Sequence, residues 1–306
     1  LLQSHPQFDW FYVLDADTGV ANPDHDLRDY IYDQFDLIFY ERFYIWEVAA
    51  GNYIAKNTRF AQQFLMEWAN MEFELPYGWN NESMKIRHSY DNGAIHLLLL
   101  RTVYPDIPLV AETCGKLWFD NFGYGNKFID YIWCTVHYLR PRRCSQHIRI
   151  LRRGHAWVLD RHILLDKWST QTFMEHGWKE KQTEEGRYWS LQRLPTGAEC
   201  DPIERKPWPL RPRLFLSTEA MRLHLRLIES QIQTNLGLPK LPDIGQCWPY
   251  CEQYDTSKLV SPDRNRIEPY LRRALYARIA LFVINLIGGA VMIVLLACAI
   301  RRRCCD

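Results

Sequence analysis

The sequence carries almost no net charge. Its 37 lysine and arginine residues stand against 36 aspartate and glutamate residues, which gives +1 over 306 residues. A protein dedicated to nucleic acid has a strongly basic surface, so this balance argues against nucleic acid as a partner. Internal repeats are also missing. Hydrophobic residues make up 47% and charged residues 24% of the chain, which excludes a disordered or collagen-like protein and predicts a folded one.

Cysteine is too sparse for a small disulfide-stapled scaffold, with nine residues in 306. Because nine is odd, at least one thiol has no partner within the chain. Cys247 and Cys251 bracket Trp-Pro-Tyr, and no second pair at metal-binding spacing completes a zinc site. We therefore expect these two residues to form a local disulfide or to remain free thiols.

Charge is absent from one long stretch, residues 281–300, which reads LFVINLIGGAVMIVLLACAI. Twenty residues at about 1.5 Å each cross a hydrocarbon core of about 30 Å, so we predict a transmembrane helix there. Residues 301–306 form a basic tail. Cys298, Cys304 and Cys305 at the edge of the span are candidates for S-acylation, and the alternative is that they are unmodified. Basic residues also precede the span, so the positive-inside rule leaves the orientation open.

The residues before this predicted transmembrane helix divide into two segments with different sequence patterns. Residues 1–195 alternate apolar runs with helical patterns, which predicts an α/β domain with its site at the carboxyl ends of strands. Residues 196–280 are rich in proline and form an extension or stem with one helix at residues 217–236. The other expected helices are 26–35, 58–72 and 91–104, and the expected strands are 11–14, 36–40, 51–56, 109–111 and 117–119.

The first chemical motif is Asp15-Ala16-Asp17, directly after the apolar run Phe-Tyr-Val-Leu. Two carboxylates at the end of a strand can share one hard divalent cation that keeps open positions for diphosphate oxygens. Phosphatases of the haloacid-dehalogenase type open with a similar motif. In them a hydroxyl residue follows two places after the second Asp, whereas here Thr18 and Gly19 come in the reverse order. No clear second acidic pair for magnesium follows either, so this alternative is less favoured.

The second motif is His176-Gly177-Trp178-Lys179. An imidazole nitrogen can complete a manganese site that carboxylates already form. Gly177 allows the backbone to approach a phosphate, and Lys179 offers a compact positive charge to a departing diphosphate. The alternative is an ordinary turn with an exposed lysine. The position of this tetrapeptide after the first motif argues against that alternative. An arginine run at residues 140–153 lies on a solvated face or beside an anionic donor, and we favour the solvated face.

Four segments in this order resemble the GT-A nucleotide-diphospho-sugar transferases. The strand and Asp15-Ala16-Asp17 resemble their metal-binding strand. Residues 51–57 and the helix that contains FLMEWA resemble a block of the α-galactosyl-, mannosyl- and xylosyltransferases. Asp91-Asn92-Gly93-Ala94 is similar to their Glu/Asp-Gln-x-Ala element, and residues 176–179 are similar to the late motif of glycogenin-like enzymes. The nearest match is an uncharacterised, largely nematode domain family, over roughly residues 5–182.

The resemblance implies a GT-A-like mixed sheet flanked by helices and a set of roles. Asp15, Asp17 and His176 would hold Mn²⁺ or Mg²⁺. The donor and its diphosphate would bind at Gly51, Asn92, Gly177 and Lys179, and Asp91 would be the catalytic carboxylate. GT-A folds place a nucleoside-binding βαβ unit before the metal-binding strand, and here only about ten residues precede it. We therefore expect an N-terminally truncated domain.

The implied activity is transfer of a hexose or pentose from a nucleotide-sugar to a glycan or protein acceptor. In a retaining enzyme Asp91 would orient the donor, and in an inverting one it would be the general base. Two alternatives remain besides transfer: a non-catalytic, membrane-tethered binding protein on the same fold, and the phosphatase. We expect a single-pass Golgi or ER protein with a luminal domain, or a tail-anchored protein that faces the cytosol. The sequon at Asn81 is a candidate for glycosylation if its loop lies in the lumen, with a chance sequon as the alternative.

Overall fold

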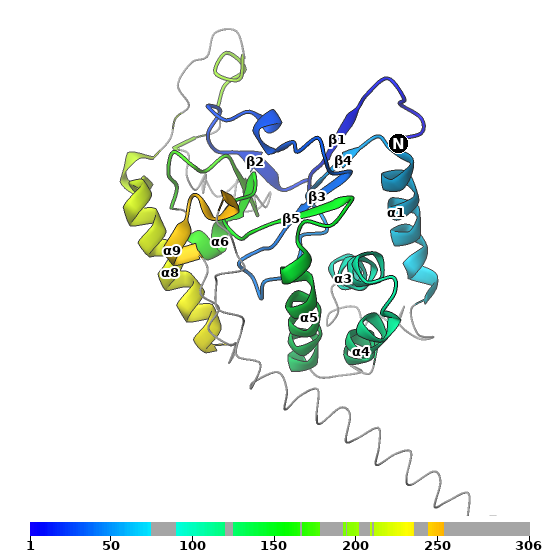
Figure 1. Cartoon of the computed structure of the whole chain (residues 1–306). Coiled ribbons are helices and arrows are strands. Elements are labelled where there is room, and N and C mark those ends of the chain that lie inside the picture. The colour runs from blue at the N-terminus through cyan, green and yellow to red at the C-terminus, as the bar shows by residue number, and fades with distance from the viewer. Residues whose placement is uncertain are drawn as a thin grey trace, which may run out of the picture. The chain divides into compact units, whose positions relative to one another are not determined.

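The computed structural model describes residues 1–74, 90–119, 125–165, 167–177, 192–193, 195–201, 209, 211–235 and 244–253. The chain divides into two compact units. The first comprises Leu1–Leu238 and Pro242–Tyr254 and contains every described residue. It is an α/β unit, as expected, with two sheets and flanking helices (Figure 1).

The first sheet has the order β1-β4-β3-β5. Its strands are β1 (Trp10–Val13), β3 (Leu37–Tyr40), β4 (Tyr53–Lys56) and β5 (Ile148–Leu151). β4 runs antiparallel to β1 and β3, whereas β5 runs parallel to β3. All four residues of β3 are buried, which matches a continuous apolar run in a central strand covered on both faces.

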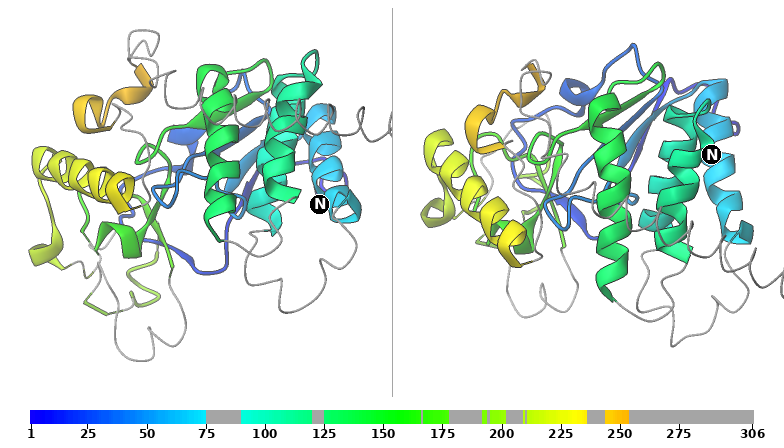
Figure 2. Two further views of the ribbon diagram at one scale, coloured as in Figure 1. Left: turned by 90° about the horizontal axis from the view of Figure 1, so that it is seen from below. Right: turned by 60° about the horizontal axis from the view of Figure 1, so that its bottom comes forward.

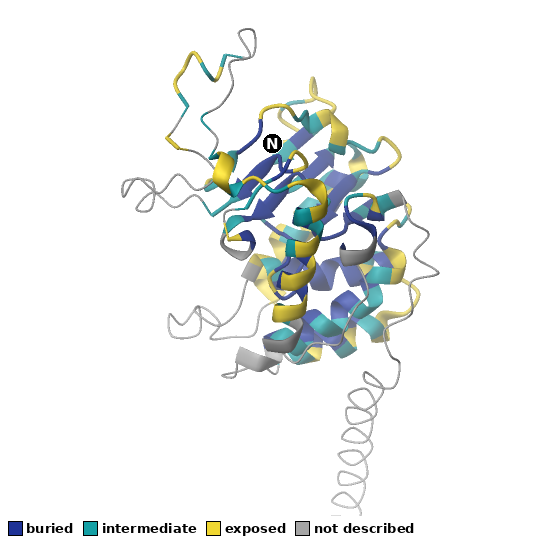
Figure 3. Cartoon of the chain, turned by 90° about the vertical axis from the view of Figure 1, so that its left-hand side faces the viewer, coloured by how far each residue is buried: buried dark blue, intermediate teal, exposed yellow. Residues whose placement is uncertain are grey.

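Four helices flank this sheet: α1 (Arg59–Asn70), α3 (Tyr90–Val103), α4 (Pro108–Phe119) and α5 (Gly125–Leu139). They lie side by side on one side of the sheet in both views of Figure 2. Their inner faces form the main core together with Leu37 and Phe39. Figure 3 shows the same division, with buried strands and helices that expose their outer faces. Thr58 caps α1, because its hydroxyl accepts from the amide of Ala61 at 3.3 Å.

A smaller second sheet has the order β2-β7-β6 and positions the candidate site. Its strands are β2 (Thr18–Val20), β6 (Val158–Asp160) and β7 (Met174–His176). β7 is the central strand, antiparallel to β2 and parallel to β6. The chain passes from the first sheet to the second within the short connection between β1 and β2, which contains both aspartates of the first motif.

Three expectations about local structure are wrong. The two strands predicted at residues 109–111 and 117–119 are one helix, α4, which buries Ala111, Cys114, Gly115 and Trp118 at helical spacing. The helix predicted at residues 26–35 shrinks to a 3₁₀ turn, Leu27–Tyr30, capped by Asp26. The arginine run is not one solvated face, because Arg143, Arg152 and Arg153 are buried.

Those buried arginines pair with carboxylates from distant parts of the chain. Glu41, which follows β3, accepts from Arg140, Arg143 and Arg153. Arg153 also pairs with Glu229 of α8 (Thr218–Asn235). A charge that leaves water needs such a partner. The run therefore ties the sheet to the C-terminal part of the unit.

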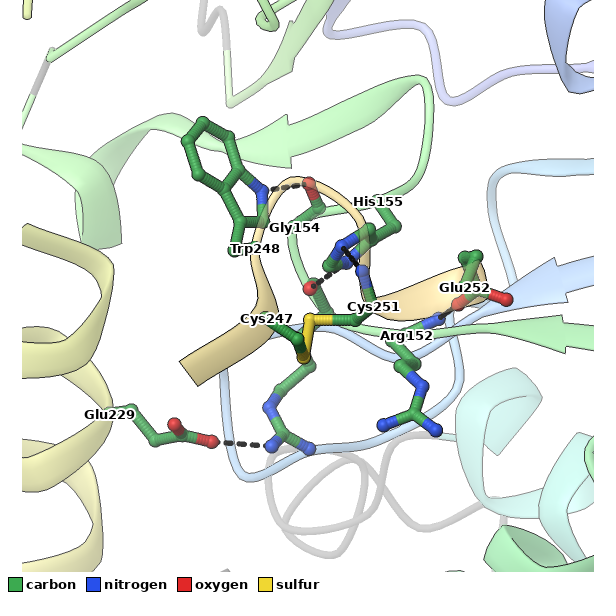
Figure 4. The surroundings of a disulfide bond; sticks show 9 residues. Arg152, Gly154, His155, Glu229, Cys247, Trp248, Cys251 and Glu252 are labelled. Carbon is green, nitrogen blue, oxygen red and sulfur yellow. Dashed lines mark hydrogen bonds and ion pairs between the residues drawn. A yellow bond between two sulfur atoms is a disulfide. The ribbon is translucent and has the colours of Figure 1, made fainter. Parts of the chain in front are cut away.

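The residues around Cys247–Cys251 continue this attachment, as Figure 4 shows. The two cysteines form a disulfide, one of the two outcomes expected for them. The indole of Trp248 donates to the carbonyl of Gly154 at 2.9 Å, and Glu252 accepts from the backbone amide of Arg152 at 2.7 Å. The described elements of the predicted extension thus belong to the same compact unit as the sheets. The boundary at residue 195 stays a prediction.

A second disulfide, Cys114–Cys134, joins α4 to α5 and was not expected. Among the described residues no helix is long and apolar enough to cross a membrane. The span predicted at residues 281–300, the tail 301–306 and the sequon at Asn81 lie outside the described residues.

Candidate metal centre

The two aspartates of the first motif lie in a tight turn between the sheets. The amide of Thr18 donates to the carbonyl of Asp15 at 2.9 Å, and this bond closes the turn around Ala16 and Asp17. The Asp15 side chain is 44% exposed, whereas that of Asp17 is 15% exposed. One carboxylate thus faces solvent and the other is largely enclosed.

The two residues that precede β4 support this turn. The Asn52 side-chain oxygen accepts from the Asp15 amide and from the Thr18 hydroxyl, each at 3.2 Å, and its nitrogen lies 3.4 Å from a carboxylate oxygen of Asp15. A Cβ on Gly51 would lie 2.1 Å from that carboxylate. Gly51 is therefore needed where it stands, because any side chain would displace Asp15.

Strand pairing brings His176 to this turn. His176 is the last residue of β7, and it pairs with Thr18 on β2 and with Asp160 on β6. The second pairing places the His176 and Asp160 side chains next to one another on one face. A residue about 160 positions away in the chain thus reaches the aspartates through the register of three short strands.

The three side chains converge on one point. His176 Nε2 lies 3.2 Å from Asp17 Oδ1 and 3.5 Å from Asp15 Oδ2. One potential ligand atom from each residue lies within 4.8 Å of the other two. Such spacing suits three ligands around one ion. The structure therefore brings together all three residues that the sequence analysis selected as metal ligands.

Behind His176 lies a chain of ionic contacts that the sequence analysis missed. His176 Nδ1 lies 3.1 Å from Asp160 Oδ1. Asp160 in turn accepts three hydrogen bonds from Arg42, the shortest 2.8 Å, and Arg42 Nη1 donates to Glu47 at 2.8 Å. A visible signal existed for Asp160, because it ends the apolar run Trp-Val-Leu in the way that Asp15 ends Tyr-Val-Leu. Arg42 and Glu47 gave no such signal.

Burial and charge shift two of these carboxyl groups in opposite directions. Burial alone would raise the pKa of Asp160, but the hydrogen bond to His176 and the Arg42 charge hold that pKa well below its ordinary range. Burial raises the pKa of Glu47 to about 7 against the opposing charge of Arg42, with Asp160 and Asp91 adding to the increase. Asp160 is therefore a fixed anion near neutral pH, and Glu47 can exchange a proton there.

The predicted donor residues of α3 lie at the same end of the unit. Asp91 is exposed, and its carboxylate contributes to the electrostatics of Glu47. Its Oδ1 accepts from the Asn92 amide at 2.8 Å. The Asn92 side-chain oxygen accepts from the backbone amide of Ala50 at 2.9 Å, so it holds the segment just before Gly51. The oxygen of Asn92 thus has a supporting contact, whereas Asp91 faces outward.

Gly177 follows the histidine and fixes the direction of the chain. Its φ of +106° lies in the region that favours glycine, and its amide donates to the carbonyl of Asp17 at 3.0 Å. This bond extends the contact between β7 and the aspartate turn. Lys179 lies outside the described residues, and its predicted role stays a prediction.

The chain belongs to the family described as "Protein of unknown function, DUF273", which it matches over residues 3–192. The matched segment contains every described residue of the centre, from Asp15 to His176. No curated protein matches the chain, and no solved structure matches it.

Proposed function

We propose that this protein is a metal-dependent glycosyltransferase of the GT-A type. It would move a hexose or pentose from a nucleotide-diphospho-sugar to a glycan or protein acceptor. The observation that supports this most is the convergence of Asp15, Asp17 and His176 at the end of the first apolar strand. The order of the resembling segments adds to it, since the late histidine returns to the early aspartates.

The donor set fits Mn²⁺ or Mg²⁺. Two carboxylates and one imidazole nitrogen are ligands that a manganese-type ion accepts. The position of Asp160 adds to the fit, because a carboxylate hydrogen-bonded to the far nitrogen of a histidine is the common arrangement behind metal-binding histidines. When bound, the ion would supply positive charge to the two phosphates of the leaving group.

The protein's own residues would divide the remaining work. In the transfer the bond between the sugar C1 and the diphosphate oxygen breaks, and a bond from C1 to an acceptor oxygen forms. The acceptor proton leaves with the nucleoside diphosphate. Asp91 faces outward near the centre, where it would orient the donor sugar. The resembled families mostly retain the anomeric configuration, so we propose retention. Gly177 and Lys179 would contact the diphosphate.

The proposed setting is a membrane of the secretory pathway, with residues 281–300 as the anchor. The two disulfides of the described unit support this setting, because disulfides persist in oxidising compartments and are rare in the cytosol. They favour the Golgi or ER lumen over a tail-anchored domain that faces the cytosol.

Donor hydrolysis by the full chain in detergent micelles tests the activity. We would supply Mn²⁺ with UDP-galactose, UDP-glucose, UDP-xylose or GDP-mannose and measure the nucleoside diphosphate released. We expect release from one donor, loss of release with a chelator and in Asp17→Ala, and full release in Asp24→Ala. Asp24 is an exposed aspartate outside the centre and serves as the matched control.

Two other results would overturn the proposal. Manganese binding without hydrolysis or transfer of any donor would favour the membrane-tethered binding protein. A phosphorylated enzyme intermediate at Asp15 would favour the phosphatase.

A further inference from the structure

We propose that Asp160 is a positioning residue that holds the His176 imidazole with its proton on Nδ1 and with Nε2 bare toward Asp15 and Asp17. The expected effect of Asp160 on metal affinity rests on the proposed function. Its structural part concerns only the protein's own residues.

The first support is the geometry around the imidazole. Nδ1 lies 3.1 Å from Asp160 Oδ1, while Nε2 faces the oxygens of Asp17 and Asp15 at 3.2 and 3.5 Å. An ionised carboxylate only accepts hydrogen bonds, so the contact with Asp160 requires a proton on Nδ1. In the neutral ring Nε2 then carries a lone pair. That lone pair points at two carboxylates, an arrangement that a cation between them would stabilise further.

The second support is the way Asp160 is held. Its side chain is 5% exposed, and the guanidinium of Arg42 donates to both of its oxygens. Arg42 is fixed on its other side by Glu47. This clamp leaves the Asp160 carboxylate one orientation and keeps it charged. A carboxylate so restrained orients its histidine more narrowly than a mobile surface one would.

The third support is a contact that Asp160 does not make. It occupies the N-cap position of the short helix α6 (Arg161–Leu164), yet its side chain forms no capping hydrogen bond. Aspartate is among the preferred capping residues, and a capping hydrogen bond stabilises a helix. Here the carboxylate is turned toward His176 and Arg42 instead. The local preference is overridden in favour of the centre.

The competing explanation is a purely structural ion cluster, with a doubly protonated His176 among three aspartates. Both explanations place Asp160 beside Nδ1. They differ in what a neutral ring does and in whether Asp160 affects metal binding through His176. An experiment must therefore read the tautomer and the metal separately.

The tautomer is read by nitrogen NMR of the full chain in detergent micelles, labelled with ¹⁵N-histidine and free of metal. The pH is raised until the ring of His176 is neutral, and His176→Ala identifies its signal. We expect the Nδ1–H tautomer in the wild type and a mixture of tautomers in Asp160→Asn. An Nε2–H tautomer in the wild type overturns the proposal, even if Asp160→Asn fails to fold.

Metal affinity is measured by Mn²⁺ titration of the same proteins. Loss of an outer carboxylate behind a metal-binding histidine weakens affinity about 10- to 100-fold, and we expect that range for Asp160→Asn. The matched control is Asp36→Asn, which removes the aspartate partner of another histidine, His147, with Nδ1 and Oδ2 2.5 Å apart. It should leave Mn²⁺ affinity unchanged. Equal weakening in both variants contradicts the proposal.

A double variant separates an action through His176 from a direct one. In a His176→Ala background Asp160→Asn should weaken Mn²⁺ binding no further, because its target is gone. An equal weakening in both backgrounds overturns the positioning role. If the wild type has the Nδ1–H tautomer but binds no Mn²⁺, the proposed function fails and the orientation of His176 by Asp160 stands.

Discussion

Single residues decide how the candidate centre is assembled. Gly51 leaves the space that the Asp15 carboxylate fills. The side-chain oxygen of Asn52 holds the turn because it accepts from the Asp15 amide and the Thr18 hydroxyl. The resemblance assigned Gly51 to the donor, whereas the geometry gives it a role in placing Asp15. Only the packing of β1 against β4 reveals this, because residues 15 and 51 are far apart in the sequence.

The first prediction concerns this close approach. In Gly51→Ala the new methyl group must displace the Asp15 carboxylate, so Mn²⁺ affinity should fall at least about 10-fold while the fold persists. Gly197→Ala is the control, since no atom lies within 4 Å of a Cβ placed there. Isothermal titration of both variants tests this, and equal affinities in the two would refute the role given to Gly51.

The second prediction concerns His96, a buried residue of α3. Its Nε2 accepts from the amide of Val48 at 2.7 Å, and burial lowers its pKa from 6.5 to about 3. The unfolded chain therefore binds one more proton between pH 6.5 and 3. The stability that the neutral ring contributes is complete above pH 6.5 and decreases as the pH falls, by up to about 1.4 kcal/mol per pH unit.

Chemical denaturation at several pH values, with His96→Gln for comparison, measures this. The wild type should lose its stability advantage over the variant as the pH drops from 7 to 5. An advantage that stays constant over this range would show that His96 does not titrate as described.

Among the larger elements, the connection between β3 and β4 links the centre to the rest of the unit. It turns through Ile45 and Trp46, which both have positive φ and are buried. Trp46 stacks under the guanidiniums of Arg140 and Arg153. Non-glycine residues in this conformation persist only where their surroundings hold them, and such strain gathers at functional sites. Here the turn places the Glu47 carboxylate within hydrogen-bonding distance of Arg42.

The third prediction tests the buried ion pairs of Glu41, the residue at the start of this connection. Glu41 pairs with three arginines and is 3% exposed. Glu41→Gln leaves those charges short of a partner, and we expect a loss of about 3–5 kcal/mol in unfolding free energy. Glu74→Gln breaks the exposed pair with Arg101 and should cost about 0–1 kcal/mol. Equal losses in urea unfolding would contradict the importance of the buried cluster.

The elements differ in how far the sequence predicts them. Residues 59–70, 90–103 and 218–235 are helices close to the expected ranges, because their apolar residues repeat at helical spacing. Residues 108–119 were misread as strands, since short apolar runs look alike in both structures. The second sheet was not foreseen, because three-residue strands leave almost no pattern. The metal ligands were found from their motifs, but Arg42 and Glu47 join them only through tertiary contacts.

At the scale of the whole molecule, the described C-terminal elements and the predicted anchor bear on where the protein works. Glu229 and the segment around Cys247 pack in the same unit as the sheets. The two disulfides of that unit need oxidising surroundings to form. These disulfides agree with the proposed luminal domain, for which residues 281–300 are the predicted anchor.

The fourth prediction follows from the proposed luminal location. The protein produced in its native cells should carry an N-linked glycan at Asn81, so glycosidase treatment should increase its mobility in gel electrophoresis. Asn81→Gln should abolish that shift. Ser4→Ala, which alters no sequon, should preserve it. If glycosidase treatment leaves the mobility of the wild-type protein unchanged, this result would contradict the luminal placement.

The fifth prediction concerns the cation itself. Electron paramagnetic resonance of Mn²⁺ added to the full chain in detergent measures binding without any assumption about donor or acceptor. We expect one bound Mn²⁺ per chain, with binding lost in Asp17→Asn, weakened in His176→Ala and kept in Asp24→Asn. If the wild type leaves the signal of free Mn²⁺ undiminished, or if these two variants bind as it does, Asp15, Asp17 and His176 are not a metal centre.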